Sequence, residues 1–64
     1  SINEGDTFSG AVYKLTPKEA LVKLENGLIG SAELNGKVLN IDDSVHCQVI
    51  SKSHKLILKL IESV

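Results

Sequence analysis

The chain has 64 residues and a formal net charge of −1, from seven lysines and eight acidic residues, and it contains no arginine. A chain of this length makes one small domain, which buries only about 60% of the surface that its unfolded form exposes. The charge argues against a strong general affinity for phosphate backbones, and no apolar run approaches the roughly 20 residues of a membrane-spanning helix.

Apolar and polar residues alternate with a period of two in the first third of the chain, which predicts β-strands. A first strand is expected over residues 7–13, with Phe8 and Val12 on the face that packs into the core. Pro17 interrupts the pattern, because proline lacks the N–H that a central strand needs. A second strand is expected over residues 20–24.

The middle of the chain contains two Asn-Gly pairs, each in a predicted turn. Residues 25–27 predict a tight hairpin turn, because an Asn-Gly pair tolerates positive φ at both central positions. A short third strand follows over residues 28–32. Residues 33–37 can then form one turn of helix that ends at Gly36 as its C-cap.

The last third of the chain predicts two more strands. Apolar residues alternate strictly over residues 45–50, so Cys47 should face the core and His46 the solvent. A polar turn at residues 51–54 leads to a fifth strand over residues 55–61, for which a helix is the competing interpretation. The lone cysteine excludes an internal disulfide and suits a reducing intracellular compartment.

Five short strands in one small chain must curl to bury their apolar faces and protect their edges. We therefore expect an all-β protein, a small five-stranded Greek-key barrel of the OB-fold type with at most one short helical turn between strands three and four. An SH3-like barrel is the alternative that periodicity leaves open. Because the chain begins at Ser1 rather than methionine, we expect residues 1–64 to be a single domain from a larger multidomain protein.

Four segments of the sequence resemble the S1 RNA-binding domain family, whose members have an S1-type OB-fold. The segments are EGDTFSGAVYKL, EALVKLENGLIG, LNIDDSVHCQVI and HKLILKL, in the order that the family has them. Gly10 and Val12 match the opening motif, and Gly27 and Gly30 match the next one. The resemblance implies a divergent repeat of the kind found in ribosomal protein S1 and in the multi-S1 factors that process ribosomal RNA in the nucleolus.

The sequence departs from this family at the positions that usually contact RNA. The family typically has aromatic residues where Lys18 and Leu21 stand, and a histidine where Glu33 stands. Stacking on an aromatic side chain is worth about 1–3 kcal/mol per base, so losing two such platforms should weaken RNA binding by orders of magnitude. Only Lys55 keeps the basic position that the family has near its end.

The remaining candidates for RNA contact lie on or beside the two loops that border the ligand face of an OB-fold. Lysines in these loops would act as a salt-sensitive clamp on the RNA backbone without reading bases, and a protonated histidine would add to their charge. The alternative is that loop lysines serve only solubility. The candidate residues are Tyr13, Lys18, Lys23, Lys52, His54 and Lys55.

Nothing in the sequence predicts catalysis, a cofactor or a metal site. One cysteine and two histidines, Cys47, His46 and His54, do not make a zinc-binding pattern without a CxxC pair. The adjacent carboxylates of Asp42 and Asp43 have no histidine or nucleophile beside them, and a turn or cap explains them better.

The expected function is therefore non-enzymatic. We expect one repeat of a ribosomal-RNA-processing protein that binds single-stranded or structured RNA weakly and without sequence preference. It would lie inside the cell, in the nucleolus or nucleus by preference or else in the cytoplasm, and would have no membrane contact. Neighbouring S1 repeats or other proteins are further expected partners. The alternative is an OB module for protein–protein interaction or architecture that contacts no RNA.

Overall fold

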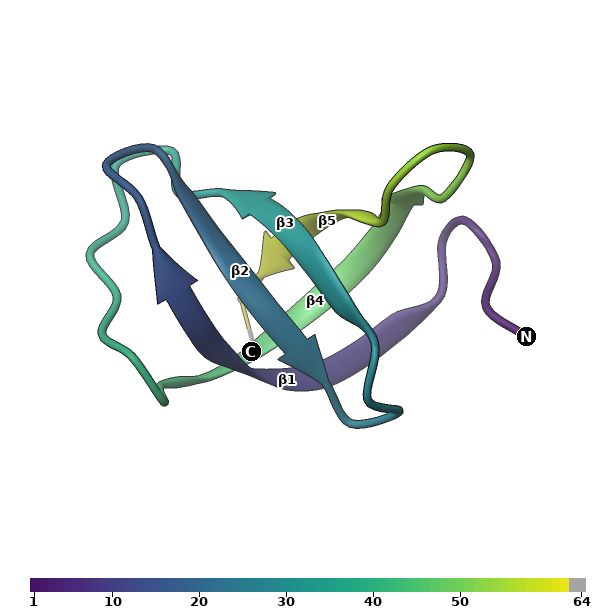
Figure 1. Ribbon diagram of the computed structural model, residues 1–64, viewed down its shortest axis with the longest axis horizontal. Coiled ribbons are helices and arrows are strands. Elements are labelled where there is room, and N and C mark those ends of the chain that lie inside the picture. Colours follow the sequence, from purple (N-terminus) through teal and green to yellow (C-terminus); the bar gives the residue numbers. More distant parts are fainter. Residues whose placement is uncertain (63–64) are drawn as a thin grey trace.

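The protein is a closed five-stranded β-barrel (Figure 1), which a computed structural model describes over residues 1–62. The strands are β1 (Thr7–Leu15), β2 (Glu19–Leu24), β3 (Ile29–Glu33), β4 (Ser44–Ser51) and β5 (Ile57–Ile61). Their order around the barrel is β1-β2-β3-β5-β4, with β4 paired to β1 and with β3 and β5 parallel. This order is that of a small OB-like barrel, so the predicted fold class is confirmed. Within residues 1–62 no helix is present, and so none that could cross a membrane.

The inward and outward faces of the strands agree with the predicted alternation, but some strands begin or end at other residues than predicted. β1 continues two residues beyond the predicted end, to Leu15, and β5 begins at Ile57 rather than at residue 55. Because residues 57–61 pair with both β3 and β4, the competing helix interpretation of this segment is wrong.

The core is built from small and medium apolar side chains, because the barrel is too narrow for many large ones. The predicted inward positions are confirmed: Val12 and Cys47 are fully buried, and Phe8 packs against the buried cluster. The buried residues are Val12, Ala20, Val22, Leu24, Ala32, Cys47, Val49 and Leu58. Gly10 allows β1 to lie close over β2, since a Cβ there would stand 2.8 Å from the Lys23 carbonyl oxygen.

Both Asn-Gly turns differ from the prediction. In residues 25–27 only Gly27 has a positive φ, of 90°, so the hairpin has a three-residue loop and not a two-residue turn. The predicted helical turn at residues 33–37 is wrong. Asn35 and Gly36 have φ of 51° and 82°, and the Lys37 N–H donates to the Leu34 carbonyl over 3.0 Å. Two consecutive left-handed residues closed by such a bond make a type I′ turn.

A β-bulge interrupts the pairing of β1 with β2. Val12 pairs with Val22, but the next paired residue of β1 is Lys14, which pairs with Leu21. Tyr13 is therefore an extra residue, and Tyr13 and Lys14 together oppose one residue of β2. A bulge of this kind bends the strand and redirects side chains, and it shapes the face described next.

Candidate nucleic-acid interface

The outward-facing side chains of β2 and β3 form one surface, which we call the outer face. Glu19 pairs with Glu33, Leu21 with Ser31 and Lys23 with Ile29. Because side chains alternate between the two faces of a strand, the buried Ala20, Val22 and Leu24 leave these partners on the outside. The outer face thus has two glutamates at one end of the strands and a lysine at the other.

One end of the outer face carries positive charge. Lys23 is exposed and has Ala11 of β1 and Ile29 of β3 as its neighbours. Lys55 is exposed in the loop before β5, two residues before Ile57, which pairs with Ser31 of β3. One lysine thus pairs with a residue of β3, and another lies in the loop that leads to the strand beside β3.

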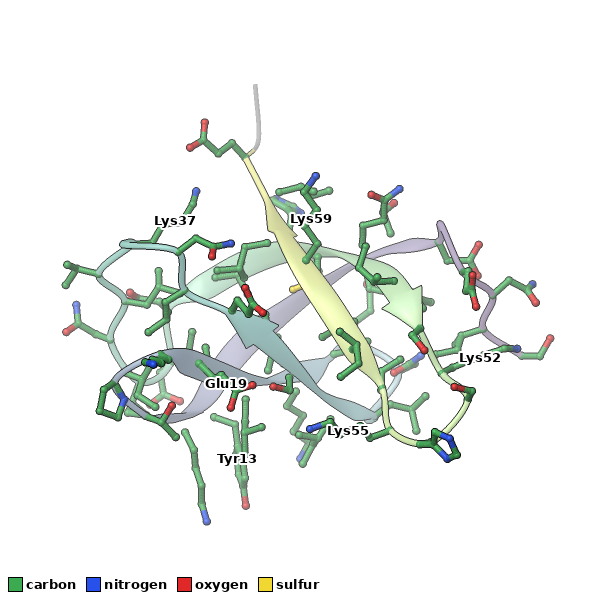
Figure 2. All side chains as sticks on the ribbon, turned by 90° about the horizontal axis from the view of Figure 1, so that it is seen from above. Tyr13, Glu19, Lys37, Lys52, Lys55 and Lys59 are labelled. Carbon is green, nitrogen blue, oxygen red and sulfur yellow. The ribbon has the colours of Figure 1, made fainter. Side chains whose placement is uncertain are left out.

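The bulge adds two more side chains at the level of Leu21, midway along β2 between Lys23 and Glu19. Tyr13 is 49% exposed, and the ammonium group of Lys14 lies 5.9 Å from the centre of its ring. Lys14 stands beside Leu21, a half-buried residue of the outer face. Figure 2 shows Tyr13 and Lys55 projecting from the same side of the barrel, whereas Lys37 and Lys59 lie on the opposite side. With Lys14 of β1 and Lys55 of the β4–β5 loop now counted as part of the outer face, we call Lys14, Lys23 and Lys55 its cationic half.

The other end of the outer face is acidic. Glu19 and Glu33 are directly opposed, and like charges in this position repel each other. The Ser31 hydroxyl donates to Oε2 of Glu19 over 3.0 Å, which holds that carboxylate in place. A hollow of about 460 Å³ adjoins this pair and is lined by Lys18, Leu34 and Asn35 as well. The carboxylates stand four residues along β2 from Lys23, about 13 Å away.

The predicted lysines do not converge on one edge. Lys18 lies in the loop before β2, at the acidic end, where its carbonyl accepts a hydrogen bond from the N–H of Leu34. The loop between β4 and β5, with Lys52, His54 and Lys55, lies across the barrel from it, at upper right in Figure 1. Within that loop the Lys52 ammonium group donates to the Ile2 carbonyl and is turned toward the N-terminal segment. The two loops border opposite ends of the face, so Lys18 does not lie beside Lys52 and Lys55.

The cysteine and the histidines are spread over different parts of the barrel. Cys47 is buried, and this burial raises the pKa of its thiol. His46 is exposed on β4 with its Nδ1 3.3 Å from the Ser9 hydroxyl, and His54 is exposed in the last loop. Across residues 1–62, no three His, Cys, Asp or Glu side chains are grouped so that they could hold a metal ion.

Lys14 is a member of this surface that the sequence interpretation missed. Continued alternation after Val12 would turn Lys14 inward and Leu15 outward, which is an unfavourable arrangement for both side chains. That conflict was a signal for a bulge at Tyr13, where the structure has one.

Comparison with known proteins adds no family name to this geometry. No protein-family model matches the sequence, and no curated protein is significantly similar to it. The OB-like assignment therefore rests on the order and register of the strands.

Proposed function

We propose that this chain is a non-catalytic, S1-type OB module that binds single-stranded RNA weakly and without sequence preference. The observation that supports the proposal is the cationic half of the outer face. It contains three exposed lysines, Lys14, Lys23 and Lys55, of which Lys14 stands beside the exposed ring of Tyr13. Proteins that bind single strands without sequence preference combine a positively charged groove with aromatic stacking platforms.

The same surface limits the affinity. Lysine binds phosphate as a point charge and lacks the bidentate geometry of arginine, and the Glu19–Glu33 pair repels phosphate at the other end. We further propose that the chain is one repeat of a larger nucleolar protein that processes ribosomal RNA. In such an array, neighbouring repeats raise the effective concentration of RNA at each weak site.

A nuclear magnetic resonance titration with mixed-sequence single-stranded RNA tests this proposal. Amide shifts are expected around Lys23 and Lys55, and the double variant Lys23→Glu/Lys55→Glu should abolish them. Three phosphate contacts give a slope of about −2 in log affinity against log salt, so affinity should fall about 20-fold between 50 and 200 mM salt. Lys59→Glu is the matched control, because Lys59 lies on the opposite side of the barrel. Shifts that are unaffected by the double variant would refute the proposal.

A second candidate function has its own observation. Ile50 is 46% exposed, and together with Ile57 and Lys59 it lines a hollow of about 310 Å³. Apolar side chains on the outside of β4 and β5 favour a protein partner over RNA, because they can be buried against another protein but do not bind charged phosphates. If this candidate is the correct one, Ile50→Ser should reduce partner binding and the lysine variants should not.

A further inference from the structure

We infer that the bulge in β1 builds a seat for one unpaired nucleobase, with Tyr13 as its stacking platform. This inference rests on the proposed function and assigns a position and a length to the bound RNA. It places the aromatic contact on β1, and not at Lys18 or Leu21, where the resembling family has its aromatic residues.

The bulge is the reason that Tyr13 can serve in this way. In a regular strand, residues 13 and 14 would point to opposite faces. Here both oppose Leu21, and the Lys14 ammonium group stands 5.9 Å from the centre of the Tyr13 ring. An exposed ring with a cation beside it offers a base a flat stacking partner and offers the adjacent phosphate a counter-charge.

A shallow depression begins at Ala11, two residues before Tyr13 on β1. It measures about 420 Å³ and is lined by Gly10, Ala11, Lys23, Glu25 and Gly27 among others. On the outside of β1 the depression is bordered by Ala11, whose side chain is a single methyl group, and Lys23, the partner of Ala11 on β2, also lines it. The Glu25 carboxylate is held at the hairpin end, where its Oε1 accepts the Ser9 N–H over 3.0 Å.

The charges also fix the direction in which RNA can cross. Glu25 lies at one end of β2, and the Glu19–Glu33 pair lies at the other. An RNA strand that keeps its phosphates away from both must run across the strands, from Tyr13 past Lys23 toward Lys55. The three strand-to-strand steps span about 14 Å, which corresponds to about four nucleotides at the stacked spacing of 3.4 Å. The ligand is therefore a short single strand with at least one unstacked base, because paired bases in an RNA helix do not offer their faces.

Oligouridines that contain one 2-aminopurine test the seat by the quenching of their fluorescence. Tyr13→Ala should lower the affinity at least about 5-fold, and up to about 150-fold, whereas Tyr13→Phe should keep it, because the ring remains. Tyr13 is half exposed, and an unchanged amide spectrum of each variant will show that the fold is intact. In a series from two to eight nucleotides, affinity should stop rising at about four. Intermolecular nuclear Overhauser contacts from the Tyr13 ring to base protons are expected in the wild-type complex and need no variant.

The outcomes separate the seat from the proposed function. If Lys23→Glu/Lys55→Glu abolishes binding but Tyr13→Ala leaves it unchanged, RNA binds this face without the seat, and the inference is overturned. Affinity that keeps rising to eight nucleotides overturns the crossing direction. A complete absence of RNA shifts in the wild-type chain refutes the proposed function itself, and the seat with it.

Discussion

The opposed carboxylates at the acidic end give a prediction that can be worked out from their register. Glu33→Lys converts a like-charge cross-strand pair into an oppositely charged one. For charges about 6 Å apart in water, the interaction is about 0.7 kcal/mol, and a Debye length of about 8 Å at physiological salt halves it. Removing the repulsion and adding an attraction should therefore raise the free energy of unfolding by about 0.7 kcal/mol. Because Glu19 is half-buried and held by Ser31, the favourable partner has little freedom to lose.

The prediction is measured by thermal and urea unfolding. For a chain of this size the Tm should rise by about 3–6 °C, and the gain should fall to about 0.2 kcal/mol in 1 M salt, where the Debye length is about 3 Å. Glu4→Lys is the matched control, because it changes the net charge equally at an exposed position of the N-terminal segment. Equal stabilisation by Glu4→Lys would show that overall charge, and not the Glu19–Glu33 pair, carries the effect.

Three further predictions follow from the composition, the core and one turn. With no arginine and one exposed aromatic ring, the chain should bind mixed single-stranded RNA no tighter than high micromolar at physiological salt, and submicromolar anisotropy data would place the site elsewhere. Cys47 should react slowly with thiol reagents in native buffer and quickly in denaturant, and Cys47→Ser should cost about 1–3 kcal/mol of stability. Fast native labelling would require a one-residue register shift in β4. Burial raises the pKa of the Cys47 thiol in the folded chain. Above the ordinary pKa of a cysteine thiol, the unfolded chain ionises and the folded chain does not, so the free energy of unfolding should fall as pH rises. Cys47→Ala should lack this dependence on pH. Asn35→Val should lower stability by about 1–2 kcal/mol, because a β-branched residue tolerates left-handed φ poorly, whereas Asn35→Gly should not.

The fold could be predicted because each strand buries one face, so that burial is visible as alternation in the sequence. Phe8, Val12 and Cys47 were all placed correctly on this basis. The turns could not be predicted in the same way. Both contain Asn-Gly, yet only Asn35 adopts a positive φ. At the other turn the Leu24 N–H donates to the Leu28 carbonyl, which encloses a three-residue loop. An Asn-Gly pair permits both the three-residue loop and the type I′ turn, and the register of the flanking segments decides which of the two forms.

The candidate site was harder to predict, because it depends on where strand ends and irregularities fall in space. Tyr13 and Lys55 project from one side of the barrel, whereas Lys18 and Lys52 lie elsewhere, and the role of all these residues stays a prediction. Their separation follows from the barrel order, which sequence periodicity does not contain. Lys14 was missed because a single extra residue reverses the alternation beyond it.

Net charge is a poor guide to this surface for a related physical reason. The value of −1 averages over charges that the barrel keeps apart by about 13 Å along β2, which exceeds the Debye length of about 8 Å at physiological salt. A phosphate at Lys23 therefore experiences the nearby charges, including Glu25, more strongly than the distant Glu19 and Glu33. At low salt the screening length grows to about 30 Å, and the carboxylates then oppose binding. For this face the gain in affinity at very low salt should consequently flatten, rather than follow the constant slope of a uniformly basic groove.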